Sequence, residues 1–240
     1  MADLSLPPGP NEILEAVRTP LARAFGGEQH LRLGGGTALA ARWHHRHSTD
    51  VDLFVEPDPY RNFHWNTGGR FTLDLTAAAP VDRLVIAEDG AYISFQGRSG
   101  HVSVAHARGL PLDPRSSDTV AGTDVPLETT AEILAKKLLF RMARDKELLP
   151  RDLYDIAFAR QKDPAALQTA LRAVRTDQLG ELVEVFKDHR IRSDHPDVSA
   201  VLTPSDPELT TSSSAIVERL VIRELGQRSP ERRPSPELTR

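Results

Sequence analysis

The residues whose types and spacing best suit a chemical reaction form two small groups in the N-terminal half of the chain. Gly34–Gly36 would let the backbone approach a ligand closely, and they precede a helix-like segment that begins at Thr37. The free N–H groups and positive dipole end of that helix would attract an anion such as a triphosphate. Asp50 and Asp52 follow in a segment that alternates like a strand, so both carboxylates would project from one face and share a divalent cation. A phosphate-binding turn beside paired carboxylates is what nucleotidyl transfer requires.

Each of these groups, taken alone, has an ordinary explanation. Consecutive glycines also suit a simple turn, and an Asp-x-Asp pattern also suits the solvated face of a strand. Their order and spacing within one short segment favour the functional interpretation.

The elements that must position these groups are a helix–strand–helix unit followed by more strands. Apolar residues recur at helical spacing up to Phe25, and Gly26–Gly27 ends that helix. Alternating segments separated by glycine-containing turns indicate a mixed sheet that ends in a meander. The expected strands cover residues 30–33, 50–55, 71–76, 84–87, 92–95 and 101–106, and the second helix covers 37–43.

The C-terminal half is predicted to be helical. Thr129 with Glu132 forms a capping box, and Asp163–Pro164 is an N-cap followed by proline at the first helical position. We expect an α/β (α+β) fold in which a mixed sheet precedes a helical bundle. The predicted parts are a core over 1–125, a helical region over 126–226 that completes the active site, and a disordered tail over 227–240. The expected helices cover 133–143, segments beginning at 150 and 163, 179–186 and 213–225, with a polar loop over 192–211.

Composition narrows the classes of function. The 240 residues carry a net charge of −4, which excludes a globally basic nucleic-acid coat protein. The absence of cysteine excludes disulfide frameworks, thiolate zinc sites and cysteine nucleophiles. We see no signal peptide and no apolar run long enough to span a membrane, and therefore expect a cytoplasmic protein without a membrane partner. Residues 135–162 hold eight Lys/Arg and four Asp/Glu, which suits RNA or a triphosphate, although a solvated helix surface explains the same count.

Four motifs between residues 31 and 159 resemble the nucleotidyl transferase AbiEii/AbiGii toxin family, toxins of bacterial type IV-like toxin–antitoxin and phage-abortive systems. They are Gly35-Gly36-Thr37-Ala-Leu-Ala, Arg46-x-Ser48-x-Asp50-x-Asp52-Leu-Phe54, Lys137-Leu138 and Arg151-Asp152-Leu153-Tyr154-Asp155. The resemblance implies a polymerase-β-like nucleotidyltransferase fold with a helical C-terminal region. It maps the phosphate loop onto Gly36 and Thr37, and the metal carboxylates onto Asp50 and Asp52. Ser48 lies where members of the family place a small hydroxyl residue.

The predicted helix 133–143 carries a basic stripe. Lys137, Arg141 and Arg144 stand at i, i+4 and i+7 on one face, opposite the apolar stripe. Lys137 matches the lysine of the family, so we expect it to contact the triphosphate. Arg141 and Arg144 fit substrate binding and a solvated surface equally well, and Lys136 is expected at the surface.

Two acidic residues follow on the next predicted helix. Asp152 and Asp155 lie at i, i+3, so both can reach one site. Asp152 would act as a base on the acceptor hydroxyl or would orient Lys137. Alternatively, the two acids pair with Arg151 or with the Lys137 helix and lock the bundle onto the sheet. The family motif suggests that Arg46 braces the strand that carries the aspartates.

Two features are less easily accommodated. Polymerase-β-like enzymes generally carry a third metal carboxylate on a later strand, and this sequence has Ala105 near the expected position, with Asp74 and Asp82 as possible substitutes. The histidine cluster between Trp43 and Ser48 invites a zinc site. However, adjacent histidines on a helix point apart and no fourth ligand is recognisable, so we expect the histidines to line the rim of the site.

The function predicted from the sequence is nucleotidyl transfer from a nucleoside triphosphate, with Mg²⁺ or Mn²⁺ at Asp50 and Asp52. The resemblance allows the tRNA 3′ end as acceptor and implies a cognate antitoxin as partner. Two alternatives stay open. The acceptor would be a protein or small molecule, or the chain would be a catalytically degenerate nucleotide-binding protein, as the missing third carboxylate suggests.

Overall fold

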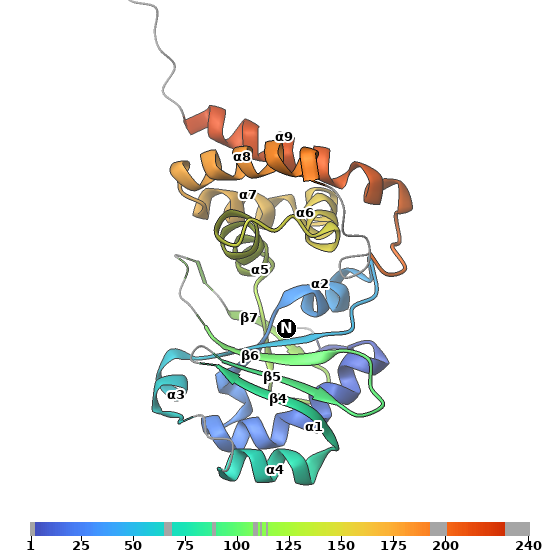
Figure 1. The fold of residues 1–240 in the computed structure, drawn as a ribbon, viewed down its shortest axis with the longest axis vertical. Helices are drawn as coiled ribbons and strands as arrows, with labels where there is room; N and C mark the ends of the chain where they lie inside the picture. The colour runs from blue at the N-terminus through green and yellow to red at the C-terminus, as the bar shows by residue number, and fades with distance from the viewer. Residues whose placement is uncertain are drawn as a thin grey trace, which may run out of the picture.

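The fold places a helical part on top of a sheet-containing part. The computed structural model describes residues 3–64, 69–87, 90–107, 110, 112–113, 115–192 and 201–228. Figure 1 shows the two parts following one another along the long axis of the molecule, with α2 (Gly35–Trp43) between the sheet and the helices above it. The segment that carries the glycine turn therefore lies at the junction of the two parts.

The sheet is mixed and has the order β1-β7-β8-β2-β3-β6-β5-β4. In its centre, β3 is antiparallel to β2 and parallel to β6, and this register pairs Asp52 with Ser103. Val51, Leu53 and Val55 are buried, so Asp52 faces the opposite side of the sheet. The strands are β1 (Asp3–Leu4), β2 (Leu31–Leu33), β3 (Val51–Val55), β4 (Val81–Ala87), β5 (Gly90–Phe95), β6 (His101–His106), β7 (Arg115–Val120) and β8 (Pro126–Glu128).

Two helices of the N-terminal half cover the face of the sheet that lies away from the helical part. These are α1 (Pro8–Phe25) and α4 (Arg70–Ala78), seen below the sheet in Figure 1. Ile13, Leu14, Val17 and Leu21 of α1 are fully buried, and the helix ends at Gly26 with the left-handed φ of 83°. The shorter elements are a 3₁₀ turn, η1 (Glu28–His30), and α3 (Pro57–Asn62).

The helical part begins at Thr129, the N-cap residue of the predicted capping box. The Thr129 hydroxyl accepts a hydrogen bond from the backbone N–H of Glu132, and Asp163 does the same for Ala166, so both predicted N-caps are confirmed. The first helix continues directly into a π-helical segment, η2. The elements are α5 (Thr130–Lys136), η2 (Lys137–Arg144), α6 (Pro150–Lys162), α7 (Pro164–Ala173), α8 (Thr176–Arg192) and α9 (Pro207–Arg228).

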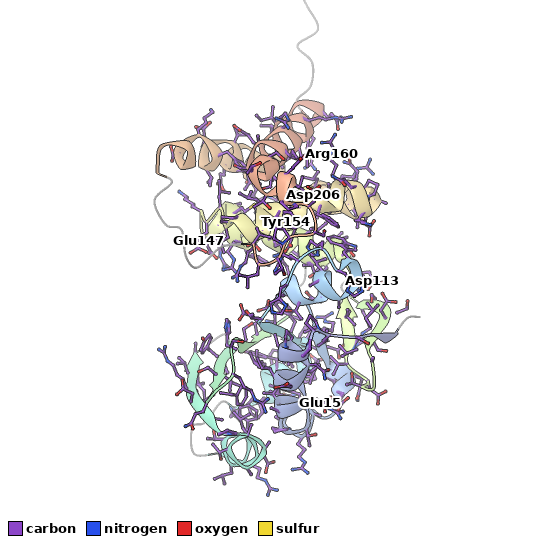
Figure 2. All side chains as sticks on the ribbon, turned by 90° about the vertical axis from the view of Figure 1, so that its right-hand side faces the viewer. Glu15, Asp113, Glu147, Tyr154, Arg160 and Asp206 are labelled. Carbon is purple, nitrogen blue, oxygen red and sulfur yellow. The ribbon has the colours of Figure 1, made fainter. Side chains whose placement is uncertain are left out.

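Tyr154 of α6 connects three segments at the junction of the two parts. Its fully buried hydroxyl donates to the carbonyl oxygen of His45 at 3.1 Å and accepts from the backbone N–H of Asp206 at 3.2 Å. Figure 2 labels Tyr154 and Asp206, which lie near each other in the helical part. These bonds hold the chain that follows α2 against α6 and the start of α9.

Two predicted elements were wrong. Residues 71–76 form the helix α4 and not a strand, because Phe71 and Leu75, one helical turn apart, are the buried residues, while Leu73 is 62% exposed. The last helix begins at Pro207, inside the predicted loop, because the Asp206 side chain accepts from the Leu209 N–H at 3.0 Å and caps it.

The predicted fold class is confirmed by a mixed sheet followed by helices. The division at residue 125 stays a prediction, and β8, which follows it, completes the sheet. Residues 193–200 of the predicted loop and 229–240 of the predicted tail lie outside the described residues. No helix in the described part of the chain has the length and apolar character needed to cross a membrane.

Candidate active site

The glycine turn brings the start of α2 against Asp52 of β3. Gly34 donates from its backbone N–H to the carbonyl oxygen of Asp52 at 2.9 Å. Gly35 has a left-handed φ of 63°, and a Cβ atom there would overlap Asp52 Oδ2. A Cβ atom at Gly36 would overlap the Arg46 guanidinium. A side chain at either position would therefore have to displace a charged side chain of the site, and Gly35 also has a backbone conformation that favours glycine. Gly36, in the first turn of α2, lies beside the Arg46 guanidinium.

Thr37 holds the other end of this turn through its side chain. It is fully buried, and its hydroxyl bonds to the Ser48 hydroxyl at 2.8 Å and to the carbonyl oxygen of Asp50. The Thr37 side chain thus ties α2 to the beginning of β3.

Asp50 and Asp52 both face a polar cavity. Asp50 Oδ1 lies 3.0 Å from His101 Nδ1, and Oδ2 lies 3.5 Å from an Arg151 nitrogen. Burial disfavours the charge on Asp50, but the His101 hydrogen bond and the nearby Arg151 outweigh it and lower the pKa of this carboxyl below its ordinary value. The lowered pKa keeps Asp50 in its carboxylate form. Asp52 Oδ1 accepts a hydrogen bond of 2.6 Å from the Ser103 hydroxyl.

Asp155 is the centre of a buried ion-pair network behind this cavity. Arg46 contacts it with two nitrogens, Nε at 2.6 Å from Oδ1 and Nη2 at 2.9 Å from Oδ2. His45 Nε2 lies 2.7 Å from Oδ1, and Lys137 Nζ lies 3.1 Å from Oδ2. Although burial opposes its charge, the Arg46 and Lys137 cations hold the pKa of the Asp155 carboxyl well below its ordinary value. Arg46 thus connects the glycine turn to α6 instead of bracing β3.

Lys137 is directed into the cavity by a second carboxylate. Its ammonium contacts Asp152 Oδ1, and both side chains are almost fully buried. Asp152 Oδ2 also lies 3.7 Å from Arg141 Nε. The pairing of Asp152 and Asp155 with the Lys137 helix, which the sequence left as an alternative to a catalytic role, is therefore present in the structure.

Arg141 and Arg144 lie at the outer end of η2. Arg141 is about half exposed and lies between Asp152 and Glu147, 3.6 Å from the latter. Arg144 pairs with Asp145 at 2.7 Å, and its guanidinium lies 5.2 Å from the centre of the Phe140 ring. Although η2 is a π-helix, Lys137, Arg141 and Arg144 all line one cavity beside Asp52.

Two cavities share lining residues on the Asp52 side of the site. The first, which we call the polar cavity, has a volume of about 300 Å³. The second, which we call the mixed cavity, has a volume of about 340 Å³ and adds apolar walls from Phe54, Ile133 and Phe140. Both are lined by Asp52, Ser103, Lys137, Arg141 and Asp152. The polar cavity is further lined by Gly36, Arg46, Ser48, Asp50, His101 and Arg151.

A model of one protein family matches residues 21–228, which is most of the chain. Its description is nucleotidyl transferase AbiEii toxin, type IV toxin–antitoxin system. The chain belongs to the AbiEii family. It is accordingly a nucleotidyltransferase of the toxin–antitoxin type, for which the family implies a nucleoside triphosphate substrate and a cognate antitoxin.

Solved structures from Helicobacter pylori were also found. One, described as a candidate nucleotidyltransferase, is 16% identical with a TM-score of 0.48, covering 91% of this chain and 95% of its own. The second, JHP933, is 17% identical with a TM-score of 0.48, covering 91% of this chain and 93% of its own. No protein with a curated function matches the chain in sequence.

The strand on which a third carboxylate was expected places a serine opposite Asp52. Ser103, not Ala105, pairs with Asp52 across the parallel strands β3 and β6. The proposed substitutes lie elsewhere. Asp74 is paired with Arg70 on α4, and Asp82 is exposed on β4, at the edge of the sheet. Neither lines the polar or the mixed cavity.

Several residues around the site were missed or misplaced by sequence reasoning. His45 is fully buried and stacks on Tyr154 with 5.7 Å between ring centres, so it does not line the rim. Lys136 is not at the surface, because its ammonium contacts Glu128 of β8 and lies 3.5 Å from the centre of the Phe54 ring. His101 and Ser103 were not identified, and no local signal marks them. They reach the site only through the register of β6 against β3.

Replacing Gly35 with alanine is expected to reduce nucleotidyl transfer by about 100-fold, because a Cβ atom would displace Asp52 and a misplacement of about 1 Å can have this effect. The left-handed φ would also lower the free energy of unfolding by about 1 kcal/mol. Initial rates and urea unfolding measure both effects. The control is Gly180→Ala in α8, where an added Cβ atom would meet no neighbour. This variant should have a more stable helix and unchanged activity. Wild-type activity in the Gly35 variant would contradict the role of this turn.

Proposed function

We propose that this protein transfers a nucleoside monophosphate from a nucleoside triphosphate to the 3′ end of tRNA, with Mg²⁺ or Mn²⁺. The observation that carries this proposal is the polar cavity, where the start of α2, the Asp50–Asp52 pair and Lys137 converge. A helix N-terminus and a lysine attract phosphates, while two carboxylates attract a divalent cation.

The aspartate pair fits a magnesium ion. Among the residues that the structure describes, no group of three or more His, Asp or Glu side chains is arranged to hold a metal ion. Mg²⁺ needs fewer protein ligands, because it commonly uses one or two carboxylates and completes its coordination with water and substrate phosphates. When bound, the ion would neutralise developing charge on the phosphates. Asp50 and Asp52 would hold it.

The residues of the chain account for the other requirements of the reaction. The 3′ hydroxyl oxygen bonds to the α-phosphorus, the bond between that phosphorus and the oxygen bridging to the β-phosphate breaks, and pyrophosphate leaves. Gly36 and Thr37 would bind phosphate through backbone N–H groups, with Gly35 allowing close approach, and Lys137 would neutralise the triphosphate. Asp152 orients Lys137 through Oδ1 and would take the hydroxyl proton at Oδ2.

The proposed acceptor is supported by basic side chains beside the cavities. Arg141, Arg144 and Arg151 are 45%, 53% and 32% exposed, and Lys146 is exposed close by. An RNA strand would gain affinity from such a group through its phosphates. Because tRNA is cytoplasmic, this proposal also places the protein in the cytoplasm, and there it would meet its antitoxin.

The test is incubation of the purified protein with Mg²⁺, tRNA and each of the four α-labelled nucleoside triphosphates in turn. We expect label to enter tRNA with at least one of them. Chelation of the metal should prevent labelling, and so should periodate oxidation of the terminal ribose, which removes the accepting hydroxyl. Label that enters a protein or a small molecule instead would reject the tRNA acceptor.

One observation favours a second candidate, nucleotide binding without transfer. Ser103 stands opposite Asp52 in the strand where a third carboxylate was expected, so the site has two carboxylates from its strands. Tight binding of a triphosphate with no labelled product from any acceptor would support this candidate.

A further inference from the structure

Lys136 is a buried cation that the proposed reaction does not use. Its side chain is 10% exposed, and its ammonium contacts Glu128 Oε1 and lies 3.5 Å from Glu132 Oε1. Glu128 is fully buried, and burial raises its pKa to about 7 against the opposing charge of Lys136. Two carboxylates therefore fix the position of one ammonium group, which also covers the face of Phe54.

This ammonium borders the mixed cavity and not the polar one. Lys136 lines the mixed cavity together with Phe54, Ile133 and Phe140, whereas Lys137, the next residue, lines both cavities. Because the cavities share Asp52 and Lys137, a triphosphate in the polar cavity would leave the rest of its nucleotide pointing into the mixed one. The mixed cavity combines the apolar side chains of Phe54, Ile133 and Phe140 with charged side chains. Such a combination of apolar surface and fixed polar groups can bind a planar ring with a polar edge.

We propose that Lys136 is a specificity-determining residue that donates a hydrogen bond to a carbonyl oxygen of the donor nucleobase in the mixed cavity, with Glu128 as its positioning residue. This inference rests on the proposed function. An ammonium group only donates hydrogen bonds. Guanine, cytosine and uracil each present at least one carbonyl oxygen, whereas adenine has none and carries an amino group, itself a donor, where guanine has O6. The site therefore selects carbonyl-bearing bases over adenine.

The experiment measures binding without turnover by calorimetry in Mg²⁺. The probes are the α,β-methylene analogues of the four nucleoside triphosphates, which cannot release pyrophosphate, and inorganic tripolyphosphate, which has no base. The wild type should bind at least one carbonyl-bearing analogue about tenfold or more tighter than the adenine analogue, as expected for a hydrogen bond to a charged group. The Lys136→Met/Glu128→Gln variant removes the ammonium together with its nearest carboxylate, and Glu132 remains as the one carboxylate of the group, near the cation of Arg32.

In this double variant, the preference over adenine should fall to about twofold or less, while the affinity for tripolyphosphate should not change. Lys162→Met is the matched control, because Lys162 also lies over an aromatic ring, that of Phe158, but lines neither cavity. It should keep the wild-type preference.

Three outcomes would overturn the inference. A preference that persists in the double variant would remove Lys136 from base selection, and an equal loss of tripolyphosphate affinity would make it a phosphate ligand. A wild type that binds tripolyphosphate but does not distinguish the bases would reject this inference alone. A wild type that binds none of the probes would reject the proposed function as well.

Discussion

Replacing Asp52 with asparagine is expected to lower the rate of nucleotidyl transfer by at least about 1,000-fold, which corresponds to about 4 kcal/mol of lost transition-state stabilisation. Asparagine has the same shape and can still accept the 2.6 Å hydrogen bond from Ser103. What it lacks is the negative charge that the proposed cation requires. The loss should therefore appear in kcat, measured as label transferred under saturating triphosphate, and not in the thermal midpoint.

The matched control is Asp82→Asn, which removes a carboxylate from β4 at the edge of the sheet. Asp82 is exposed and lines neither cavity, so this variant should transfer label at the wild-type rate. It also tests whether Asp82 substitutes for the third carboxylate. If the Asp52 variant kept more than about a tenth of the activity, the paired-carboxylate site would be wrong.

The second large effect concerns stability. Asp155→Asn should lower the free energy of unfolding at neutral pH by about 3–5 kcal/mol, the usual cost of breaking a buried ion pair by removing one partner. Asp155 is completely buried, and Arg46 contacts it with two nitrogens. Without the carboxylate, Arg46 would be a buried cation with its main partner neutralised. Urea unfolding of wild type and variant measures the difference.

The pH dependence of this difference has a definite sign. The folded-state pKa of Asp155 is lowered well below the ordinary value of 3.8, so its contribution is fully present above that value and is lost as the pH falls through the folded-state pKa. The wild type should therefore lose its advantage over the variant in acid. Asp177→Asn, which breaks an exposed pair with Arg175, should leave unfolding unchanged at every pH. An Asp155 variant as stable as the wild type at neutral pH would show that this network does not hold α6 to the glycine turn.

Local patterns predicted the parts of this protein whose structure depends on near neighbours. The caps at Thr129 and Asp163 depend on a side chain and an N–H group three residues away, and both are present. The glycine turn and the alternation around Asp52 were likewise readable from consecutive residues. The segment 71–76 failed because its polar–apolar alternation fits a strand, and only packing showed which residues are buried.

Residue types and short spacings were enough to indicate the family, the glycine turn and the paired aspartates. The side chains that surround them follow from tertiary packing. Register across β3 and β6 brought Ser103 to Asp52, and the closure of α6 on the turn enclosed Asp155 between Arg46 and Lys137. Contacts between segments far apart in the chain follow from how the sheet and helices pack, and no local periodicity encodes that arrangement.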